Sequence, residues 1–267
     1  MIFIIEQISE SYWKVFINNP PLNIFDPEFS VALRGTMDKL EANKTLKVVV
    51  FESLNPDFYV AHAELIRVFE FPKGLGDTGL SISWPDISKR LEQASFVSIA
   101  SIRGRARGLG SEFIQAFDMR FGSKEKAIFG QPEIGIGSFP GGGGMERLHL
   151  LTGKARALEI LLSGSDFDAE TAAAYGWINR AIADDDLDAF VNNLASRISS
   201  FDRNIIAKIK EIINKRVILP KNEDIMETQT AFFESLAQPE ARTRIKALLE
   251  KGLQQPGDVE LNFAKYL

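Results

Sequence analysis

Two glutamates in glycine-rich surroundings are the residues best suited to chemistry in this sequence. Glu112 ends the segment Arg107-Gly-Leu-Gly-Ser-Glu112, and Glu133 lies in Gly130-Gln-Pro-Glu133, shortly before the run Pro140–Gly144. Glycine lets a backbone approach a ligand closely, and a carboxylate beside such a backbone is a candidate general acid or base. If the two carboxylates share one pocket, we expect the chain to be an enzyme.

The first glycine cluster, Gly104–Glu112, predicts the end of a strand and the start of a helix. The first N–H groups of a helix have no internal partner and carry partial positive charge, so they can bind an anion or a developing oxyanion. The Walker phosphate loop, the dinucleotide fingerprint and the serine-hydrolase elbow all fail to match here. A tight turn without chemistry is the alternative for this segment taken alone.

Two further segments have small residues where a backbone could meet a ligand. The four glycines Gly141–Gly144 are costly in backbone entropy, so we expect the fold to gain close approach to a ligand or a water from them. A sharp turn into the next helix is the alternative. In Phe58–Leu65, Ala61 and Ala63 would let the backbone lie against a ligand, and an ordinary turn is again the alternative.

These segments need elements that position them. Residues 1–55 predict a strand, a turn, a helix and a strand, and the apolar run 46–51 is typical of a strand buried on both faces. Further strands are expected over 96–102 and 118–122, and a loop over 66–82 because of its prolines and glycines. Helices are expected over Trp84–Gln93, Ser111–Phe117, Lys154–Leu162 and Asp168–Ala174. Alternating strands and helices predict a layered α/β core.

From about residue 185 the pattern predicts helices only, and we expect a helical appendage of roughly 70–80 residues. One of its helices, 203–217, carries an apolar stripe, with three lysines mostly off it. The stripe consists of Ile205, Ile206, Ile209, Ile212 and Ile213, and the lysines are Lys208, Lys210 and Lys215. The appendage is expected to pack on its own core or on a partner subunit.

Composition bounds the function. The 267 residues are 45% hydrophobic and 25% charged, as in one globular domain with a smaller appended unit. A net charge of -5 argues against nucleic acid as the main partner. The absence of cysteine excludes disulfides and thiol nucleophiles, and with only two histidines no metal site is expected. The apolar start predicts a strand rather than a signal peptide, and no apolar run reaches ~18 residues, so we expect no membrane span and a cytoplasmic location.

In their order and spacing the three segments together resemble the crotonase, or enoyl-CoA hydratase/isomerase, superfamily. The resemblance covers most of the chain from Asn19 onward and is strongest over residues 100–180, including Gly-Gln-Pro-Glu133 and Gly176-Trp-Ile-Asn-Arg180. It implies an α/β fold, a crotonase-like spiral of ββα units with the acyl-CoA site, over residues 1–195. It also implies a C-terminal helical region, 196–267, that builds homotrimers, usually paired into homohexamers.

The resemblance further implies the site. Such enzymes bind acyl-CoA thioesters, and because coenzyme A is part of the substrate, no separate cofactor is expected. The N–H groups of Ala63 and Leu109 are expected to form the oxyanion hole, and Glu112 and Glu133 to hold one water between them. We hypothesise that Glu112 is the water-activating base and that Glu133 gives a proton to C2. Two carboxylates that lie close together in a dry pocket cannot easily both be ionised, so the pKa of one of them should be raised. Contacts with water or substrate are expected from Gly141, Ala61, His62 and Leu65.

Two departures from the superfamily lie in the expected pocket. Leu109 stands where the middle of three glycines is common, and the leucine should narrow the acyl pocket. His62 stands where glycine is common, so it adds bulk and a titratable ring near the thioester. A histidine that points to solvent or packs locally is the alternative for His62.

Other departures lie outside that pocket. Alternation of Arg103, Arg105 and Arg107 predicts one shared face, which would contact CoA phosphates or form intersubunit ion pairs. The C-terminus lacks the superfamily's Phe-x-x-Lys-Arg ending, which leaves no firm CoA contact for Lys251, and it continues as an extra stretch, Leu253–Leu267.

The leading hypothesis is therefore an enoyl-CoA hydratase-like lyase that acts on an α,β-unsaturated acyl-CoA. A Δ3-Δ2 enoyl-CoA isomerase, which often needs only one carboxylate, is the alternative among enzymes, followed by a hydrolase or decarboxylase on the same scaffold. From a different class, the chain could be a non-catalytic or RNA-binding relative. The lysine-bearing helix 203–217 could be cited for RNA binding, but a solvated face explains it better and the acidic balance opposes it.

Overall fold

The computed structural model describes residues 1–71, 83–217 and 219–267. Most of the loop expected over 66–82, including Pro72, Gly74, Gly76 and Gly79, lies outside the described residues. The described part of that stretch holds a short 3-10 turn, Val68–Glu70. Within the described ranges, no helix is both long and apolar enough to cross a membrane.

The strands form two sheets. The first has the order β1-β2-β3-β5-β7-β10, with β1 and β2 antiparallel and the remaining neighbours parallel. Its strands are β1 (Phe3–Gln7), β2 (Tyr12–Ile17), β3 (Val48–Ser53), β5 (Val97–Ile102), β7 (Met119–Ser123) and β10 (Arg180–Ile182). The second sheet has the order β4-β6-β8-β9. Its strands are β4 (Phe58–Val60), β6 (Arg105–Arg107), β8 (Ile128–Gly130) and β9 (Asp166–Asp168).

The chain alternates between the two sheets. A strand of the first sheet is followed by a short strand of the second and then by a helix, as in β5, β6 and α3 (Leu109–Gln115). β3 with β4 and β7 with β8 repeat this step, so the expected spiral of ββα units is confirmed. The short strands of the second sheet have three residues each, too few to show a periodic pattern in the sequence.

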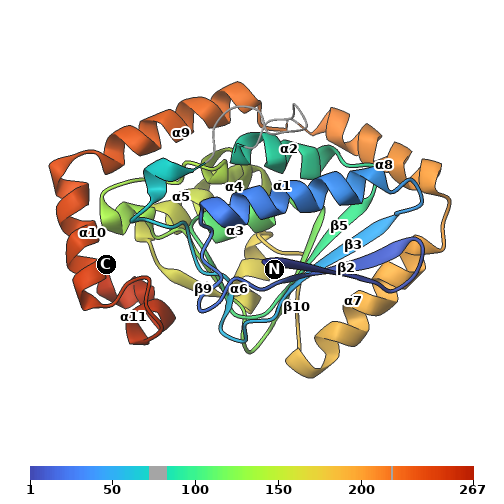
Figure 1. Cartoon of the computed structure of the whole chain (residues 1–267), viewed down its shortest axis with the longest axis horizontal. Helices are drawn as coiled ribbons and strands as arrows, with labels where there is room; N and C mark the ends of the chain where they lie inside the picture. Colours follow the sequence, from blue (N-terminus) through green and yellow to red (C-terminus); the bar gives the residue numbers. More distant parts are fainter. Residues whose placement is uncertain (72–82, 218) are drawn as a thin grey trace.

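The remaining helices surround the sheets (Figure 1). They are α1 (Pro27–Ala42), α2 (Trp84–Gln93), α4 (Gly144–Thr152), α5 (Lys154–Ser163), α6 (Ala169–Tyr175), α7 (Asp184–Ser199), α8 (Arg203–Arg216), α9 (Asn222–Leu236), α10 (Pro239–Lys251) and α11 (Asp258–Leu261). The 3-10 turns η2 (Glu133–Ile136) and η3 (Phe263–Tyr266) follow β8 and α11. The boundary expected at residue 195 falls inside α7, whose buried residues pack on the first sheet.

β3 is buried on both faces, as its apolar run predicted. Val49 and Phe51 pack in the cluster that includes α1, whereas Val48 and Val50 pack in the cluster that includes α7. α1 begins because the Asp26 side chain accepts the Phe29 N–H at 2.7 Å, which satisfies a helix-terminal donor. The two clusters give β3 and its neighbours a rigid base from which the loops of the second sheet project.

The isoleucine stripe of α8 faces outward rather than toward the core. Ile206 is buried, but Ile209 is 59% exposed, and Ile205, Ile212 and Ile213 are exposed with it. The expectation that the lysines are solvated is wrong for Lys210, whose ammonium is buried and donates to Asp118 Oδ2 at 2.7 Å. The charge of Asp118 offsets the cost of burying that ammonium.

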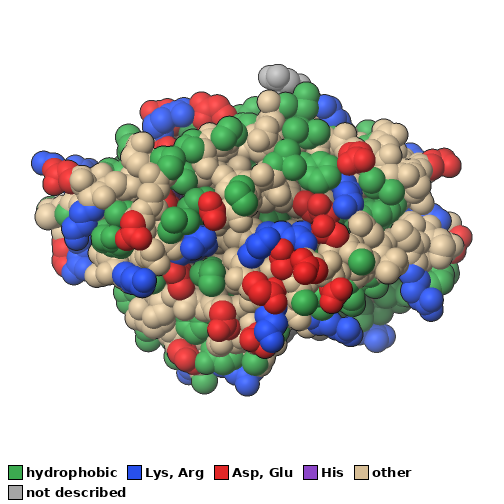
Figure 2. Space-filling model, turned by 90° about the horizontal axis from the view of Figure 1, so that it is seen from below, with side chains coloured by type: hydrophobic (Ala, Val, Ile, Leu, Met, Phe, Trp, Pro, Cys, Tyr) green, Lys and Arg blue, Asp and Glu red, His purple; other side chains and the backbone are tan. Residues whose placement is uncertain are grey.

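Acidic and basic side chains are interspersed over the face of the molecule that Figure 2 shows. Nucleic-acid binding draws most of its affinity from clustered lysines and arginines. On the described residues of this face, such side chains alternate with carboxylates rather than forming a continuous basic stripe.

Candidate active site

The turn between β6 and α3 places Glu112 at the start of a helix. Gly108 has φ +49°, a left-handed conformation that favours glycine, and its N–H donates to Gly130 O at 3.0 Å. A Cβ on Gly108 would lie 2.8 Å from Glu133 Oε1. The turn therefore needs glycine both for its backbone and to make room for the second carboxylate.

The four-glycine run holds Glu112 directly. Glu112 is 2% exposed, and its Oε1 accepts the N–H of Gly142 at 2.8 Å and that of Gly144 at 2.7 Å. A Cβ on Gly142 would lie 2.7 Å from Glu112 Oε2, and one on Gly144 would lie 2.8 Å from Oε1. The entropy that these glycines cost is thus offset by close approach to a buried carboxylate within the protein.

Glu133 is in a different environment. It begins η2 and is 8% exposed, and its Oε2 has no hydrogen-bond partner among the described residues. Burial, followed by the charge of Glu112, raises its pKa well above the usual value. Burial also raises the pKa of Glu112, to about 7, although the two glycine N–H groups oppose the shift. The pair therefore favours an ionised Glu112 beside a protonated Glu133 near neutral pH.

Two backbone N–H groups in the same cavity are available to a ligand. Leu109 is the first residue of α3, so its N–H has no acceptor within the helix. Around Ala63, the carbonyl of His62 accepts the Phe25 N–H and the N–H of Glu64 donates to Phe25 O, both at 2.9 Å. In the part of the chain that the structure describes, neither Ala63 N–H nor Leu109 N–H donates to a protein acceptor.

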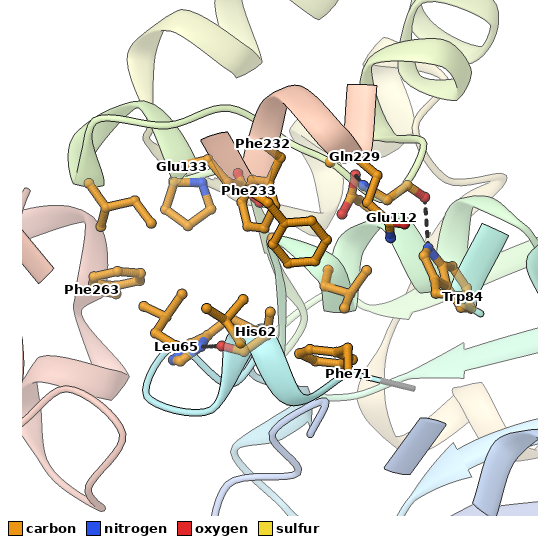
Figure 3. A pocket seen from close by; sticks show the side chains of 18 residues that line it. His62, Leu65, Phe71, Trp84, Glu112, Glu133, Gln229, Phe232, Phe233 and Phe263 are labelled. Atoms are coloured by element: carbon orange, nitrogen blue, oxygen red, sulfur yellow. Dashed lines mark hydrogen bonds between the residues drawn. The ribbon is translucent and has the colours of Figure 1, made fainter. Parts of the chain in front are cut away.

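One cavity collects these groups (Figure 3). Its empty volume is about 710 Å³, including space open to solvent. The two carboxylates lie in an otherwise largely apolar wall, where Trp84 Nε1 donates to Gly142 O at 2.7 Å. The apolar lining residues are Ala63, Leu65, Val68, Phe71, Trp84, Leu109, Pro132, Ile136, Phe232, Phe233 and Phe263. A cavity with this lining suits an apolar organic group with a few directed polar contacts.

Most of the expected site residues lie together. Glu112, Glu133, Ala63, Leu109, Gly141, His62 and Leu65 all line the cavity. Ala61 does not; it packs with Leu22 and Phe58 behind the loop, and its N–H donates to Asn23 O at 3.3 Å. Gly141 lies against α9, since a Cβ there would meet Phe232 Cβ at 2.5 Å.

Several lining residues were not expected from the sequence. Trp84 comes from α2, Gln229 and Phe232 come from α9, and Phe263 comes from the segment after α11. None of them belongs to a motif, and each reaches the cavity only through packing of distant elements. An apolar residue with helical spacing gives no signal that separates a pocket wall from the core.

The surroundings of His62 differ from the solvent-exposed alternative. The ring is buried, with Nδ1 2.8 Å from Ala63 O and Nε2 3.0 Å from Glu260 Oε1. The extra C-terminal stretch therefore returns to the cavity. Phe263, from the same stretch, lies 5.8 Å from the His62 ring between ring centroids.

The three alternating arginines have hydrogen-bond partners within the chain. Arg103 Nε donates to Asp184 at 2.7 Å, Arg105 Nε donates to Leu261 O at 2.8 Å, and Arg107 Nε donates to Asp166 at 2.6 Å. These contacts tie the segment Arg103–Arg107 to α7, to Asp166 of β9 and to Leu261 of the C-terminal segment.

Comparison with known proteins gives the family. The family model described as enoyl-CoA hydratase/isomerase matches residues 7–256. This chain belongs to the enoyl-CoA hydratase/isomerase family, as the sequence resemblance indicated.

Individual relatives are distant. The chain is 30% identical over 172 residues to a probable mitochondrial enoyl-CoA hydratase of Dictyostelium discoideum, a match covering 64% of this chain and 60% of that protein. It is 25% identical over 238 residues to a short-chain-enoyl-CoA hydratase of Clostridium acetobutylicum, covering 89% and 90% of the two chains. A crystal structure of a candidate enoyl-CoA hydratase from Streptomyces avermitilis superposes with a TM-score of 0.92 at 36% identity, covering 99% of this chain and 95% of that one.

Proposed function

We propose that this chain is an enoyl-CoA hydratase-like lyase that adds water to an α,β-unsaturated acyl-CoA thioester. The observation that carries the proposal is the pair Glu112 and Glu133, two buried carboxylates in different environments that line one cavity. Membership of the family supports an acyl-CoA as substrate.

The thioester oxygen would accept the N–H groups of Ala63 and Leu109. When water adds to C3, negative charge develops on that oxygen as an enolate. Two fixed donors, one of them at the start of α3, stabilise this charge more than they stabilise the neutral substrate, and loss of one such donor typically costs roughly 3–4 kcal/mol.

The two carboxylates divide the proton transfers. Glu112, held by the N–H groups of Gly142 and Gly144, takes a proton from water as the oxygen bonds to C3. The C2–C3 π electrons move to form the enolate, and Glu133, whose pKa is raised, gives its proton to C2 as the thioester C=O re-forms. One water is consumed, and transfer of the proton from Glu112 to Glu133 restores the starting state.

The walls of the cavity favour an apolar acyl group. Leu109 presents its amide to the thioester while its side chain packs close to Gly142, where a Cβ would lie 2.6 Å from Leu109 Cδ1. Apart from the two glutamates, His62 and Gln229 are the only lining residues with strongly polar side chains among those described. A charged group on the acyl chain would therefore lose its hydration in this cavity without gaining a protein group of opposite charge.

Purified protein incubated with a panel of 2-enoyl-, 3-enoyl- and branched acyl-CoAs tests the proposal. We expect loss of the conjugated thioester absorbance and formation of a 3-hydroxyacyl-CoA. Conversion of 3-enoyl to 2-enoyl thioesters without hydration would identify an isomerase instead, and release of free CoA or CO₂ would identify a hydrolase or decarboxylase. If no thioester of the panel is turned over or bound, the chain is not an acyl-CoA enzyme.

We also propose that the helical region forms a homotrimer, alone or paired into a hexamer. The exposed isoleucines of α8 support it, because a contiguous apolar strip on a helix surface is costly in water and is typical of an interface. The strip consists of Ile205, Ile209, Ile212 and Ile213.

A further inference from the structure

Both nitrogens of the His62 ring are engaged within the protein. The Ala63 carbonyl can only accept, so Nδ1, 2.8 Å away, carries a proton. Nε2 lies 3.0 Å from Glu260 Oε1, which also accepts the Gln254 N–H at 2.6 Å. An oxygen that accepts from Gln254 is best matched by a second donor, so the geometry favours an imidazolium opposite a carboxylate.

The charges around the pair support this protonation state. Burial works against an imidazolium, but the charge and hydrogen bond of Glu260 outweigh it and raise the pKa of His62. Burial would likewise raise the pKa of Glu260, but His62, the Gln254 N–H and Arg107 together lower it. Arg107 also donates to the backbone carbonyl of Glu260 at 2.6 Å.

The ring is bonded to the loop that carries the expected oxyanion donor. The His62 carbonyl accepts from Phe25, and in a trans peptide this turns the Ala63 N–H the opposite way. In the next peptide, the Ala63 carbonyl accepts from the His62 ring and the Glu64 N–H donates to Phe25 O. The other three polar groups of these two peptides are therefore fixed, and the Ala63 N–H is the one left for a ligand.

The same loop is joined to the C-terminal segment at further points. The Leu65 N–H donates to Gln254 Oε1 at 2.9 Å, and the Gln254 side-chain amide donates to Glu64 Oε1. His62 and Glu260 are 198 residues apart in sequence. The segment after α10 therefore holds the loop around Ala63 only once the whole chain has folded.

We propose that the His62–Glu260 ion pair is a positioning device for the oxyanion hole, which aims the Ala63 N–H at the thioester oxygen and makes the C-terminal segment Leu253–Leu267 part of the active site. His62 is a positioning residue rather than a proton donor, because neither ring nitrogen is free. The inference rests on the proposed acyl-CoA function.

The test uses hexanoyl-CoA labelled with ¹³C at the thioester carbonyl, a saturated ligand that cannot be hydrated. Difference infrared spectra of the complex report how strongly the oxyanion donors polarise that carbonyl. We expect a lowered stretching frequency in the wild type and partial loss of the shift in Glu260→Gln. In Glu260→Gln, kcat for the 2-enoyl-CoA that is turned over should fall roughly 10- to 100-fold while KM changes little. A misaligned donor weakens the binding of the transition state more than the binding of the substrate.

Glu250→Gln is the matched control, because Glu250 is an exposed carboxylate on α10; it should keep both the shift and kcat. If thermal melting shows that Glu260→Gln is unfolded at the assay temperature, Glu260→Asp gives the same comparison with a smaller loss. A folded variant with an unchanged carbonyl shift or unchanged kcat overturns the proposal. A wild type that binds the ligand without a carbonyl shift overturns the positioning proposal, because no oxyanion donor then polarises the carbonyl. A wild type that binds neither this ligand nor any thioester of the panel overturns the acyl-CoA function itself.

The ion pair can be tested without any ligand. In protein labelled with ¹⁵N-histidine there are two rings, His62 and His149, and the His149→Asn spectrum identifies His62. Both His62 nitrogens should be protonated at neutral pH in the wild type, and Glu260→Gln should release one proton. A neutral His62 ring in the wild type overturns the ion pair.

Discussion

The Gly144 N–H donates to Glu112 Oε1 at 2.7 Å, so the last glycine of the four-glycine run holds the first carboxylate of the site. The Gly142 N–H donates to the same oxygen at 2.8 Å. Two donors on one oxygen leave the other oxygen free to meet a water, and they favour the ionised form that a general base requires. In the proposed mechanism, the glycine run therefore acts on catalysis through Glu112.

Removal of either carboxylate should abolish most of the hydratase turnover. In Glu112→Gln and Glu133→Gln the amide keeps the side-chain shape but cannot exchange a proton, so kcat should fall by roughly 10²- to 10⁴-fold. Steady-state assays with the substrate found in the panel measure this loss. Glu234→Gln, an exposed change on α9, is the control. A variant at either site with wild-type turnover would remove that residue from the mechanism.

Activity should depend on pH through the carboxylate pair. The proposed mechanism requires Glu112 to be ionised, and with its pKa at about 7, kcat/KM should fall as pH drops below that value. Glu133 must be protonated and its pKa is raised well above the usual value, so activity should also fall on the alkaline side. A kcat/KM profile that is flat between pH 5 and 8 would contradict these roles.

The same pKa shift should appear in stability. The pKa of Glu112 is higher in the folded chain than the ordinary 4.5, so the folded state binds the proton more tightly than the unfolded state. The resulting stabilisation is fully present below pH 4.5 and is lost as pH rises through about 7. Urea unfolding across this range should show a decline in the free energy of unfolding, and Glu112→Gln should reduce its slope. An identical slope in the variant would argue against the raised pKa.

Gly142 should not tolerate a side chain. A Cβ there would lie 2.6 Å from Leu109 Cδ1 and 2.7 Å from Trp84 Nε1, as well as 2.7 Å from Glu112 Oε2. We expect Gly142→Ala to lose about 1–3 kcal/mol of stability through overpacking and to lower kcat about 100-fold through displacement of Glu112. Gly35→Ala is the control, because nothing lies within 4 Å of its added Cβ. If Gly142→Ala matched the wild type in thermal melts and kinetics, the four-glycine run would have more space for a side chain than the structure shows.

A charge on α8 should break the proposed oligomer. Ile209 is 59% exposed at the centre of the isoleucine strip, and Ile209→Asp would place a carboxylate in an apolar interface. Size-exclusion chromatography with light scattering should give a trimer or hexamer for the wild type and a smaller species for the variant. Leu54→Asp, at an exposed leucine of the loop after β3, should leave the mass unchanged. A monomeric wild type would refute the proposal.

The sequence by itself determined the parts of this protein that depend on neighbouring residues. The apolar run 46–51 predicted a strand buried on both faces, and α2 was predicted with its observed bounds. The glycine context singled out Glu112 and Glu133, because a backbone that approaches another group closely requires glycine, and glycine is visible in the sequence. Periodicity and backbone preference act over a few residues, and the sequence displays both.

Tertiary structure decided how distant segments meet. Only packing could place Trp84, Phe232 and Phe263 around one cavity, and only packing could turn Ile209 outward while it buried Lys210. The spacing of apolar residues indicates that a helix has an apolar stripe, but it does not indicate which surface that stripe packs against. The pairing of His62 with Glu260 likewise depends on the path of the whole chain, because no local preference couples two residues 198 positions apart.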